Sequence, residues 1–357
     1  YLGELSEEQR DALEYLFTPG ERIRLRIING SAMSFFNVRI PGVPMTVIAA
    51  DGQEVTEVEV DEFQIGTAET YDVIVTPGNG THALVAEAMD RSGMGVASLT
   101  SHPGHRATPP PLRETPTLTM ADMGMEHSMD AAAMEGGAMD HGSMDHAAMG
   151  HEMGGTGADA GAGAAMNHSM RDLSKLPPDV KTGPGIDMVS PMPMDRMDFP
   201  GLGLDKVGHR VLRYTDLAAR TANPHRMPER QMEIHLTGNM ERYMWSFDGK
   251  KFSAVTDDPI RFAYDERVRV KLVNDTMMAH PIHLHGHFFE LVNGAGMMNQ
   301  PLQHTVIVQP GGTATFDLTA NEPGDWAFHC HLLYHMHAGM MQTVTVRPFP
   351  EPGRIGA

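Results

Sequence analysis

Residues 20–105 alternate between hydrophobic and polar side chains in short runs that turn residues separate. The run from Glu21 to Ile27 has period two, which is the pattern of a strand buried on one side. Similar runs follow over 36–40, 45–48 and 71–75. Short strands with regular turns predict a β-sandwich or a barrel. Before them, residues 5–16 predict a short helix.

A second β pattern begins near residue 209 and continues to about 350. Its clearest strands are 267–273 and 305–308, and the turn Pro310-Gly311-Gly312 leads into a further strand over 314–318. After Cys330, residues 332–336 predict a helical turn. We therefore expect a second β-sandwich domain in this part of the chain.

The connection between the two patterns, residues 106–208, is too long for an ordered loop in a compact domain. Its centre, residues 120–170, holds eleven Met, five His and eight acidic residues but no Lys or Arg. Such low-complexity composition is typical of disorder. The pattern predicts an all-β protein with domains at 1–105 and 209–357, joined by a Met-rich disordered segment over 106–208.

Composition supports two folded cores, because 41% of the 357 residues are hydrophobic. The chain has no apolar run of eighteen residues or more, which argues against a transmembrane span. Its net charge of −19 disfavours nucleic acid and anionic membrane surfaces as partners. Cations are the partners that this charge favours.

Cys330, the only cysteine, lies between His329 and His331 and precedes His335 and Met340. Side chains on a strand alternate between its faces, so the two flanking histidines point one way and Cys330 the other. A thiolate, two imidazoles and a distant thioether form the ligand set of an electron-transfer copper. Cys330, His335 and Met340 supply three of these four ligands.

The fourth ligand is expected from a second histidine cluster, residues 280–287. In an extended segment, His283 and His285 share one face, whereas His280 has the opposite parity. His280 then lies with Cys330, and the His283/His285 pair lies with the two histidines that flank the cysteine. An isolated His-x-His occurs by chance in many His-rich chains. Two clusters of matching parity around the sole thiol indicate a metal centre.

The two clusters resemble the C-terminal copper motifs of the multicopper oxidases. Four further segments resemble the periplasmic copper-resistance oxidases of that family: Gly30-Ser31-Ala32-Met33, Ala49-Ala50-Asp51-Gly52, 69–75 and 238–246. The resemblance covers both ends of the chain but not its middle. It implies that both domains are cupredoxin-like, and that residues 1–105 correspond to the family's second domain, which holds no type 1 copper.

Carried over residue by residue, the resemblance implies copper sites of three types. The type 1 copper would be bound by His280, Cys330, His335 and Met340. The type 2 copper would be bound by His283, and the type 3 pair by His285, His329 and His331. Electrons would pass from a reductant to the type 1 copper and through Cys330 to the other sites, where dioxygen becomes water. No catalytic residue beyond the metal ligands is implied.

The family's trinuclear cluster takes half of its imidazoles from an N-terminal domain with two His-x-His motifs. No such motif precedes His283, so only the type 1 site is complete in this sequence. The chain also begins at Tyr1, without an initiator Met or a signal peptide. We expect a fragment that lacks the N-terminal domain, with a histidine-donating partner subunit as the alternative. The resemblance implies a periplasmic location.

The Met-rich segment carries candidate ligands of its own. Thioethers favour Cu(I), while imidazole and carboxylate accept Cu(II). Core packing, the usual role of Met, does not fit here because the intervening residues are Gly, Ala, Asp and His. We predict that this segment collects Cu(I) near the type 1 site. The candidate auxiliary ligands are Met139, His141, Met144, His146, Met149, His151 and Met153.

Two functions of different class follow from the sequence. The first is a multicopper oxidase of copper resistance, which oxidises Cu(I) and phenols and reduces dioxygen to water. The second is a copper-sequestering protein that stores metal or carries electrons without turning over oxygen. They differ in whether the missing N-terminal histidines are ever supplied to the His283 side of the site.

Overall fold

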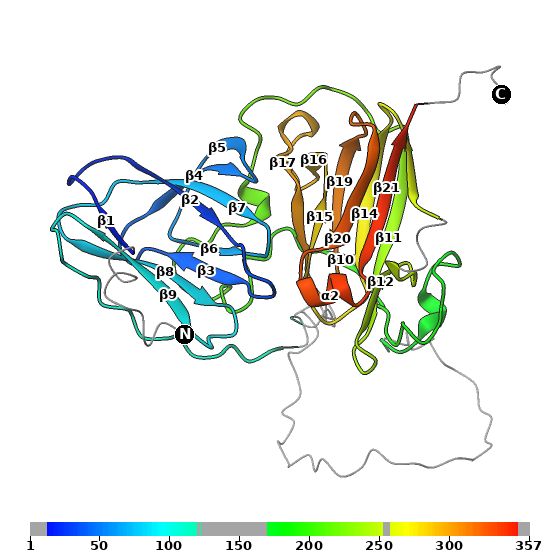
Figure 1. Ribbon diagram of the computed structural model, residues 1–357, viewed down its shortest axis with the longest axis horizontal. Coiled ribbons are helices and arrows are strands. Elements are labelled where there is room, and N and C mark those ends of the chain that lie inside the picture. The colour runs from blue at the N-terminus through cyan, green and yellow to red at the C-terminus, as the bar shows by residue number, and fades with distance from the viewer. Residues whose placement is uncertain (1–12, 120–121, 123–169, 253–257, 349–357) are drawn as a thin grey trace, which may run out of the picture.

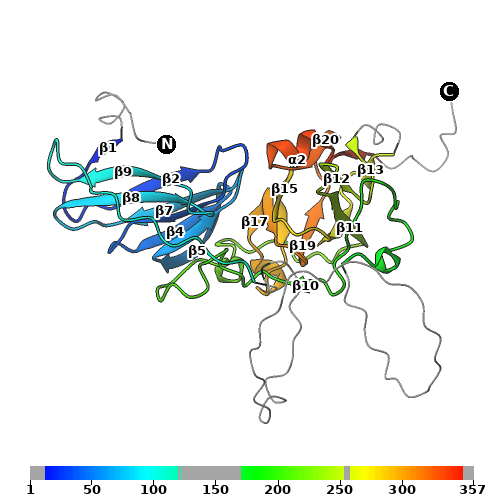
Figure 2. The ribbon, with the colours of Figure 1, turned by 90° about the horizontal axis from the view of Figure 1, so that it is seen from below.

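The computed structural model describes residues 13–119, 122, 170–252 and 258–348. These residues form two β-sandwich domains that lie side by side, one in blue to cyan and one in yellow to red (Figures 1 and 2). The expectation of an all-β protein with two domains of this kind is confirmed. Across the described ranges, no helix is long and apolar enough to span a membrane.

The first domain packs a five-stranded sheet against a four-stranded sheet. The five-stranded sheet has the order β1 (Glu14–Leu16), β9 (Met94–Thr100), β8 (Thr81–Ala88), β3 (Phe36–Arg39) and β6 (Glu62–Ile65). The other has the order β2 (Ile23–Ile28), β7 (Thr70–Val75), β4 (Met45–Ala50) and β5 (Gln53–Val60). In β7, Tyr71, Val73 and Val75 are buried and alternate with more exposed residues. This period of two directs one face of the strand into the core.

The prediction of a helix over 5–16 is wrong at its C-terminal end, because Glu14–Leu16 forms strand β1. The strand runs parallel to β9, with Glu14 opposite Ser98. Pairing with the edge of a sheet outweighs a weak local helix preference in so short a segment. Residues 5–12 lie outside the described part of the chain.

The second domain also has two sheets. The larger has the order β12 (Met244–Phe247), β11 (Arg230–Asn239), β14 (Arg267–Asn274), β19 (Gly312–Thr319), β16 (Phe289–Leu291) and β17 (Leu302–Gln303), with β10 (Met194–Asp195) also paired to β19. The smaller has the order β13 (Ile260–Ala263), β21 (Met341–Arg347), β20 (Gly324–Cys330), β15 (His280–Leu284) and β18 (Thr305–Val308). The short helices are α2 (Leu333–His337), η1 (Leu173–Lys175), η2 (Tyr214–Asp216) and η4 (Met297–Asn299).

Strands β15 and β20 are antiparallel neighbours, and this pairing brings the two histidine clusters together. His283 lies opposite His329, and Ile282 lies opposite Cys330. Cys330 belongs to the buried core between the two sheets of the second domain. The register therefore places one set of candidate ligands inside the sandwich and another on its outer face.

The disordered segment predicted over 106–208 has packed residues at both of its ends. Arg113 donates hydrogen bonds of 3.0 Å and 2.6 Å to the carboxylate of Glu62, which is fully buried in the first domain. On the other side, Leu176, Val180, Ile186 and Val189 form a small buried cluster. These flanks carry apolar and charged residues that find partners in the folded domains. Most of that centre lies outside the described residues.

Candidate metal centre

His280, Cys330 and His335 meet inside the second domain. The sulfur of Cys330 lies 3.5 Å from Nδ1 of His280 and 3.9 Å from Nδ1 of His335. The two Nδ1 atoms are 3.2 Å apart. Within the described residues, this is the group of His, Cys, Asp or Glu side chains whose geometry suits a metal ion, and all three members are buried. The structure thus brings together three residues that the sequence assigned to one site.

Met340 is tied to the same group by its backbone. The N–H of Cys330 donates to the carbonyl of Met340 at 3.1 Å, and the N–H of Met340 donates to the carbonyl of His335 at 3.0 Å. The short helix α2 folds the chain back between these contacts, as the predicted helical turn requires. Met340 is fully buried in the core that also contains Cys330.

Thr276 determines which nitrogen of His280 faces the sulfur. Its hydroxyl oxygen lies 2.7 Å from Nε2 of His280, and the hydroxyl donates to Oδ1 of Asn274 at 2.9 Å. Because a hydroxyl has one hydrogen, its oxygen accepts the Nε2–H of His280. The Nδ1 lone pair is then directed toward Cys330. A hydrogen bond to the distal nitrogen is the usual device that orients a metal-binding imidazole.

Trp245 fixes the other imidazole. Its indole is stacked on the ring of His335, with centroids 4.1 Å apart and planes 14° from parallel. Trp245 is 2% exposed and is held in turn by the edge of Tyr243 at 4.5 Å. The ring of His335 therefore cannot rotate away from the sulfur without losing its stack on Trp245.

Burial sets the protonation of this group. It lowers the pKa of His280 well below its usual range, with repulsion from His335 as a smaller cause. It also lowers the pKa of His335 to about 4, so both imidazoles are neutral and have free lone pairs at pH 7. Burial raises the pKa of Cys330, so a metal must displace the thiol proton on binding. One sulfur, two neutral imidazoles and a nearby thioether side chain fit copper.

Four more histidines gather on the opposite face of β15 and β20. The ring centroids of His283 lie 4.7 Å from His285, 5.6 Å from His329 and 5.7 Å from His331. The Nε2 atoms of His285 and His329 approach to 3.1 Å. We call these four residues the imidazole cluster. The sequence parity predicted this gathering, and the structure places all four side chains together.

Backbone carbonyls set the tautomers of two rings in the imidazole cluster. Nδ1 of His283 lies 2.8 Å from the carbonyl of His304, and Nδ1 of His329 lies 3.0 Å from that of Cys330. Each Nδ1–H therefore donates outward, and each Nε2 lone pair is free to bind a metal. Burial lowers the pKa of His283 to about 3 and that of His329 to about 4, so both rings stay neutral.

Three supporting residues escaped sequence reasoning: Thr276, Trp245 and His304. Trp245 lies in the segment 238–246, which carried the family resemblance without an assigned role. Thr276 lies four residues before His280, and His304 immediately precedes a predicted strand. In the sequence, these positions were the only sign that the three residues support the site. The predicted auxiliary ligands between Met139 and Met153 lie outside the described part of the chain.

Comparison with known proteins defines the class of this protein. Residues 1–103 and 225–350 match two family models, each described as multicopper oxidase. The chain therefore belongs to the multicopper oxidase family. It is 45% identical to the copper resistance protein A homolog of Pseudomonas syringae pv. tomato, over 93% of this chain and 55% of that protein.

A second relative and one solved structure agree with this assignment. Copper resistance protein A of Escherichia coli is 45% identical, over 93% of this chain and 56% of its own length. The crystal structure of Fet3p, a multicopper oxidase that functions in iron import, superposes with a TM-score of 0.58 at 14% identity, over 93% of this chain and 57% of that one. This last likeness concerns the fold. The chain spans just over half the length of the curated relatives that it matches.

Proposed function

We propose that this chain is the larger part of a copper-dependent oxidase that acts in copper resistance. Its substrates are Cu(I) and phenols, and its electron acceptor is dioxygen, which is reduced to water. The observation that carries the proposal is one strand, β20, with Cys330 buried on one face and His329 of the imidazole cluster on the other. The names of the copper resistance relatives support the biological role.

We assign the type 1 copper to His280, Cys330, His335 and Met340. Copper held by such ligands supplies one-electron redox chemistry. The residues contribute geometry: Thr276 and Trp245 orient the imidazoles, and the apolar core excludes water from the sulfur. Cys330 is covalently continuous with its neighbours His329 and His331, so the shortest through-bond path leads from the thiolate into the imidazole cluster.

We assign the type 2 and type 3 coppers to the imidazole cluster, with His283 on the type 2 ion and His285, His329 and His331 on the type 3 pair. Four imidazoles are half of what the family's cluster uses. His285 is exposed and His283 and His331 are half-buried, so further ligands can approach from outside the domain. We infer that another part of the full protein, or a partner subunit, supplies them.

A cavity beside the type 1 ligands supports Cu(I) as a substrate. It has a volume of about 240 Å³ and lies between the domains, next to Ala279 and Leu332, which are close in sequence to His280 and Cys330. Four thioether side chains line it: Met33, Met89, Met277 and Met278. Thioethers are soft ligands that favour Cu(I). The Met-rich segment 120–170 would deliver Cu(I) to this side of the protein.

The second candidate is a copper-sequestering protein without oxygen turnover. It is favoured by the four thioether side chains that line the cavity, because soft ligands of this kind suit the storage of Cu(I). In either case we place the protein in the periplasm, where one metal-bound cysteine is compatible with an oxidising compartment.

Copper analysis and visible spectroscopy test the proposal. We expect the chain to bind a type 1 ion with an intense blue absorption, and Cys330→Ser to lose that band completely. A blue band that survives in Cys330→Ser would remove Cys330 from the site. Oxygen consumption with Cu(I), measured on a form that carries the additional histidines, separates the oxidase from the sequestering protein.

A further inference from the structure

Strand β18 lies at the edge of the five-stranded sheet, next to β15, which carries His280 and His283. One side of an edge strand has no neighbouring strand to accept its N–H groups. Side chains nevertheless accept three N–H groups here, those of His304, Thr305 and Ile307. The first of these residues immediately precedes β18. The accepting side chains are Asp51 and Tyr214.

Asp51 comes from the first domain, where it forms the turn between β4 and β5. It is 3% exposed and has a positive φ of 48°, a backbone conformation that Asp tolerates better than most residues. Its Oδ1 accepts the N–H of Thr70 at 3.0 Å within its own domain. Its Oδ2 accepts the N–H groups of His304 and Thr305 in the second domain, both at 3.0 Å. One carboxylate therefore joins the two domains.

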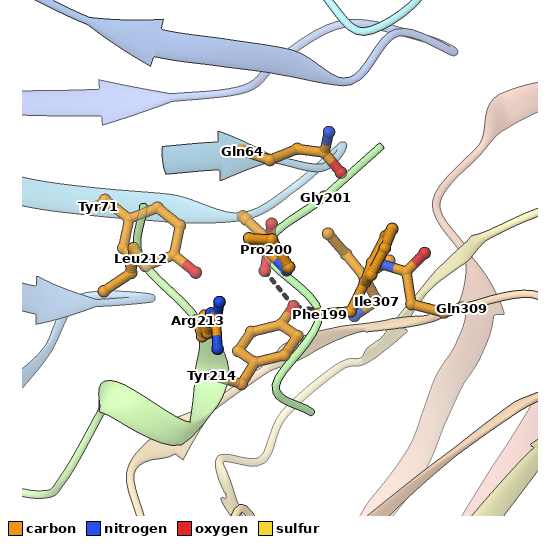
Figure 3. Close-up of a pocket in the computed structure, with 11 residues that line it drawn as sticks. Gln64, Tyr71, Phe199, Pro200, Gly201, Leu212, Arg213, Tyr214, Ile307 and Gln309 are labelled. Atoms are coloured by element: carbon orange, nitrogen blue, oxygen red, sulfur yellow. Dashed lines mark hydrogen bonds between the residues drawn. The ribbon is translucent and has the colours of Figure 1, made fainter. Parts of the chain in front are cut away.

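Tyr214 makes a second connection a short distance along the same strand. Its hydroxyl accepts the N–H of Ile307 at 3.0 Å and donates to a side-chain oxygen of Glu69 in the first domain. Figure 3 shows Tyr214 beside Ile307, at a small cavity that is also lined by Tyr71. Glu69 accepts the N–H of Gly66 at 2.7 Å, so its position is fixed within the first domain.

The segment held by Asp51 is the one that orients His283. The carbonyl of His304 accepts the Nδ1–H of His283 at 2.8 Å, and the hydroxyl oxygen of Thr305 lies 3.2 Å from the same nitrogen. Strand pairing also places His283 directly opposite Thr305. Any shift of residues 304 and 305 would move the acceptors that keep the Nε2 lone pair of His283 directed into the imidazole cluster.

We propose that Asp51 and Tyr214 are positioning residues, through which the domain without copper ligands sets the orientation of His283 and the metal affinity of the imidazole cluster. The proposal rests on the proposed function in one respect, which is that the imidazole cluster binds copper. The type 1 site is held by Thr276 and Trp245 of its own domain, so it should be insensitive to this connection.

The first test is Asp51→Asn. Asp51 uses both oxygens as acceptors, whereas Asn has one oxygen and an NH₂ group that would face backbone N–H donors. We expect the Cu(II) affinity of the imidazole cluster to fall about 10–100-fold, the range typical for lost outer-shell partners. The blue band of the type 1 site should be unchanged. Asp72→Asn is the matched control, because Asp72 is a mostly buried carboxylate of the same domain that pairs with Arg24.

Tyr214→Phe is the second variant, because it removes one hydroxyl and keeps the aromatic ring. We expect a smaller loss of affinity in the same direction. Cu(II) titration followed by electron paramagnetic resonance measures both variants. Affinities equal to that of Asp72→Asn in both cases would overturn the proposal.

A measurement on the metal-free chain separates this inference from the proposed function. Nitrogen-15 NMR of the imidazoles should show His283 as the Nδ1–H tautomer in the original chain and as a tautomer mixture in Asp51→Asn. An unchanged tautomer in that variant contradicts the positioning role. If the imidazole cluster binds no Cu(II) even in a form that carries the additional histidines, the proposed function fails, and the tautomer result still decides the role of Asp51.

Discussion

The two faces of strand β20 carry two candidate metal-binding groups that differ in exposure. His280, Cys330 and Met340 are 0% exposed and His335 is 1% exposed, whereas His285 on the other face is exposed. The buried group has all four of the ligands that we propose for a type 1 copper, and they come from one domain, so the core can close around them. The imidazole cluster has half a ligand set and remains accessible. A site with a complete ligand set can be buried, because the protein ligands replace the water molecules that the ion loses.

The two groups also differ in what orients their ligands. Thr276 and Trp245 belong to the same domain as the type 1 ligands that they hold. His283 depends on a carbonyl whose residue is fixed by Asp51 of the other domain. The comparison teaches that one domain by itself orients the ligands of the proposed type 1 site, whereas two domains together orient the imidazole cluster.

The largest expected effect is on colour. His335→Ala removes a buried type 1 ligand, and we expect the blue absorption to disappear. His285→Ala is the counterpart on the exposed face, and we expect it to leave the band at full intensity. Visible absorption at equal copper loading measures both. A loss of colour in His285→Ala would show that the two groups are not independent.

A smaller effect is expected when the outer partner of His280 is removed. Thr276→Val keeps the shape of the side chain but loses the acceptor for Nε2–H, and we expect copper affinity at the type 1 site to fall about 10–100-fold. Thr100→Val is the control, since Thr100 is equally buried and bonds to Thr81 in the first domain, away from the copper ligands. Competition with a copper chelator gives the affinities, and equal values for the two variants would contradict the role of Thr276.

Acid should unfold the metal-free chain through its buried histidines. The pKa of His283 is about 3 and that of His335 about 4 in the folded chain, below the ordinary value of 6.5. The unfolded chain thus binds protons first as pH falls, so the free energy of unfolding should decrease between pH 6.5 and 4. Urea titrations at several pH values test this. His335→Gln should flatten the decrease, and an equal slope in both would contradict the explanation.

Burial of Glu69 should give the free energy of unfolding the opposite dependence on pH. Burial, then repulsion from Asp51, raise the pKa of Glu69 from 4.5 to about 8. The folded chain therefore holds this proton where the unfolded chain loses it, and stability should fall as pH rises from 4.5 to 8. Glu69→Gln should remove this dependence, as judged from the same titrations. A decrease of unchanged slope in Glu69→Gln would assign the effect to another group.

The smallest expected effect on the metal centre comes from deleting residues 120–170. The type 1 colour should remain, because its ligands are untouched. In a complete enzyme, a higher Cu(I) concentration should be needed for turnover, while small phenols should react as before. Steady-state rates with both substrates test the collecting role. Equal losses with Cu(I) and phenols would count against it.

Several features of the fold and site could be read from local sequence. Alternation along residues 71–75 and 267–273 predicted strands that the structure contains. The same rule separated Cys330 from its two neighbours and paired it with His280. Helix α2 returned His335 to the sulfur, as the spacing indicated. These predictions succeeded because strand parity and a helical turn are local properties of the backbone.

The sequence by itself determined which side chains share a face of a strand, and with the family resemblance it indicated copper. Only the tertiary structure decided what holds them: Thr276 on His280, Trp245 on His335, and Asp51 on the segment beside His283. Asp51 and His304 are separated by 253 residues, and nothing in local periodicity encodes their contact. The packing of two domains creates it, because edge N–H groups that become buried must find acceptors wherever the fold provides them.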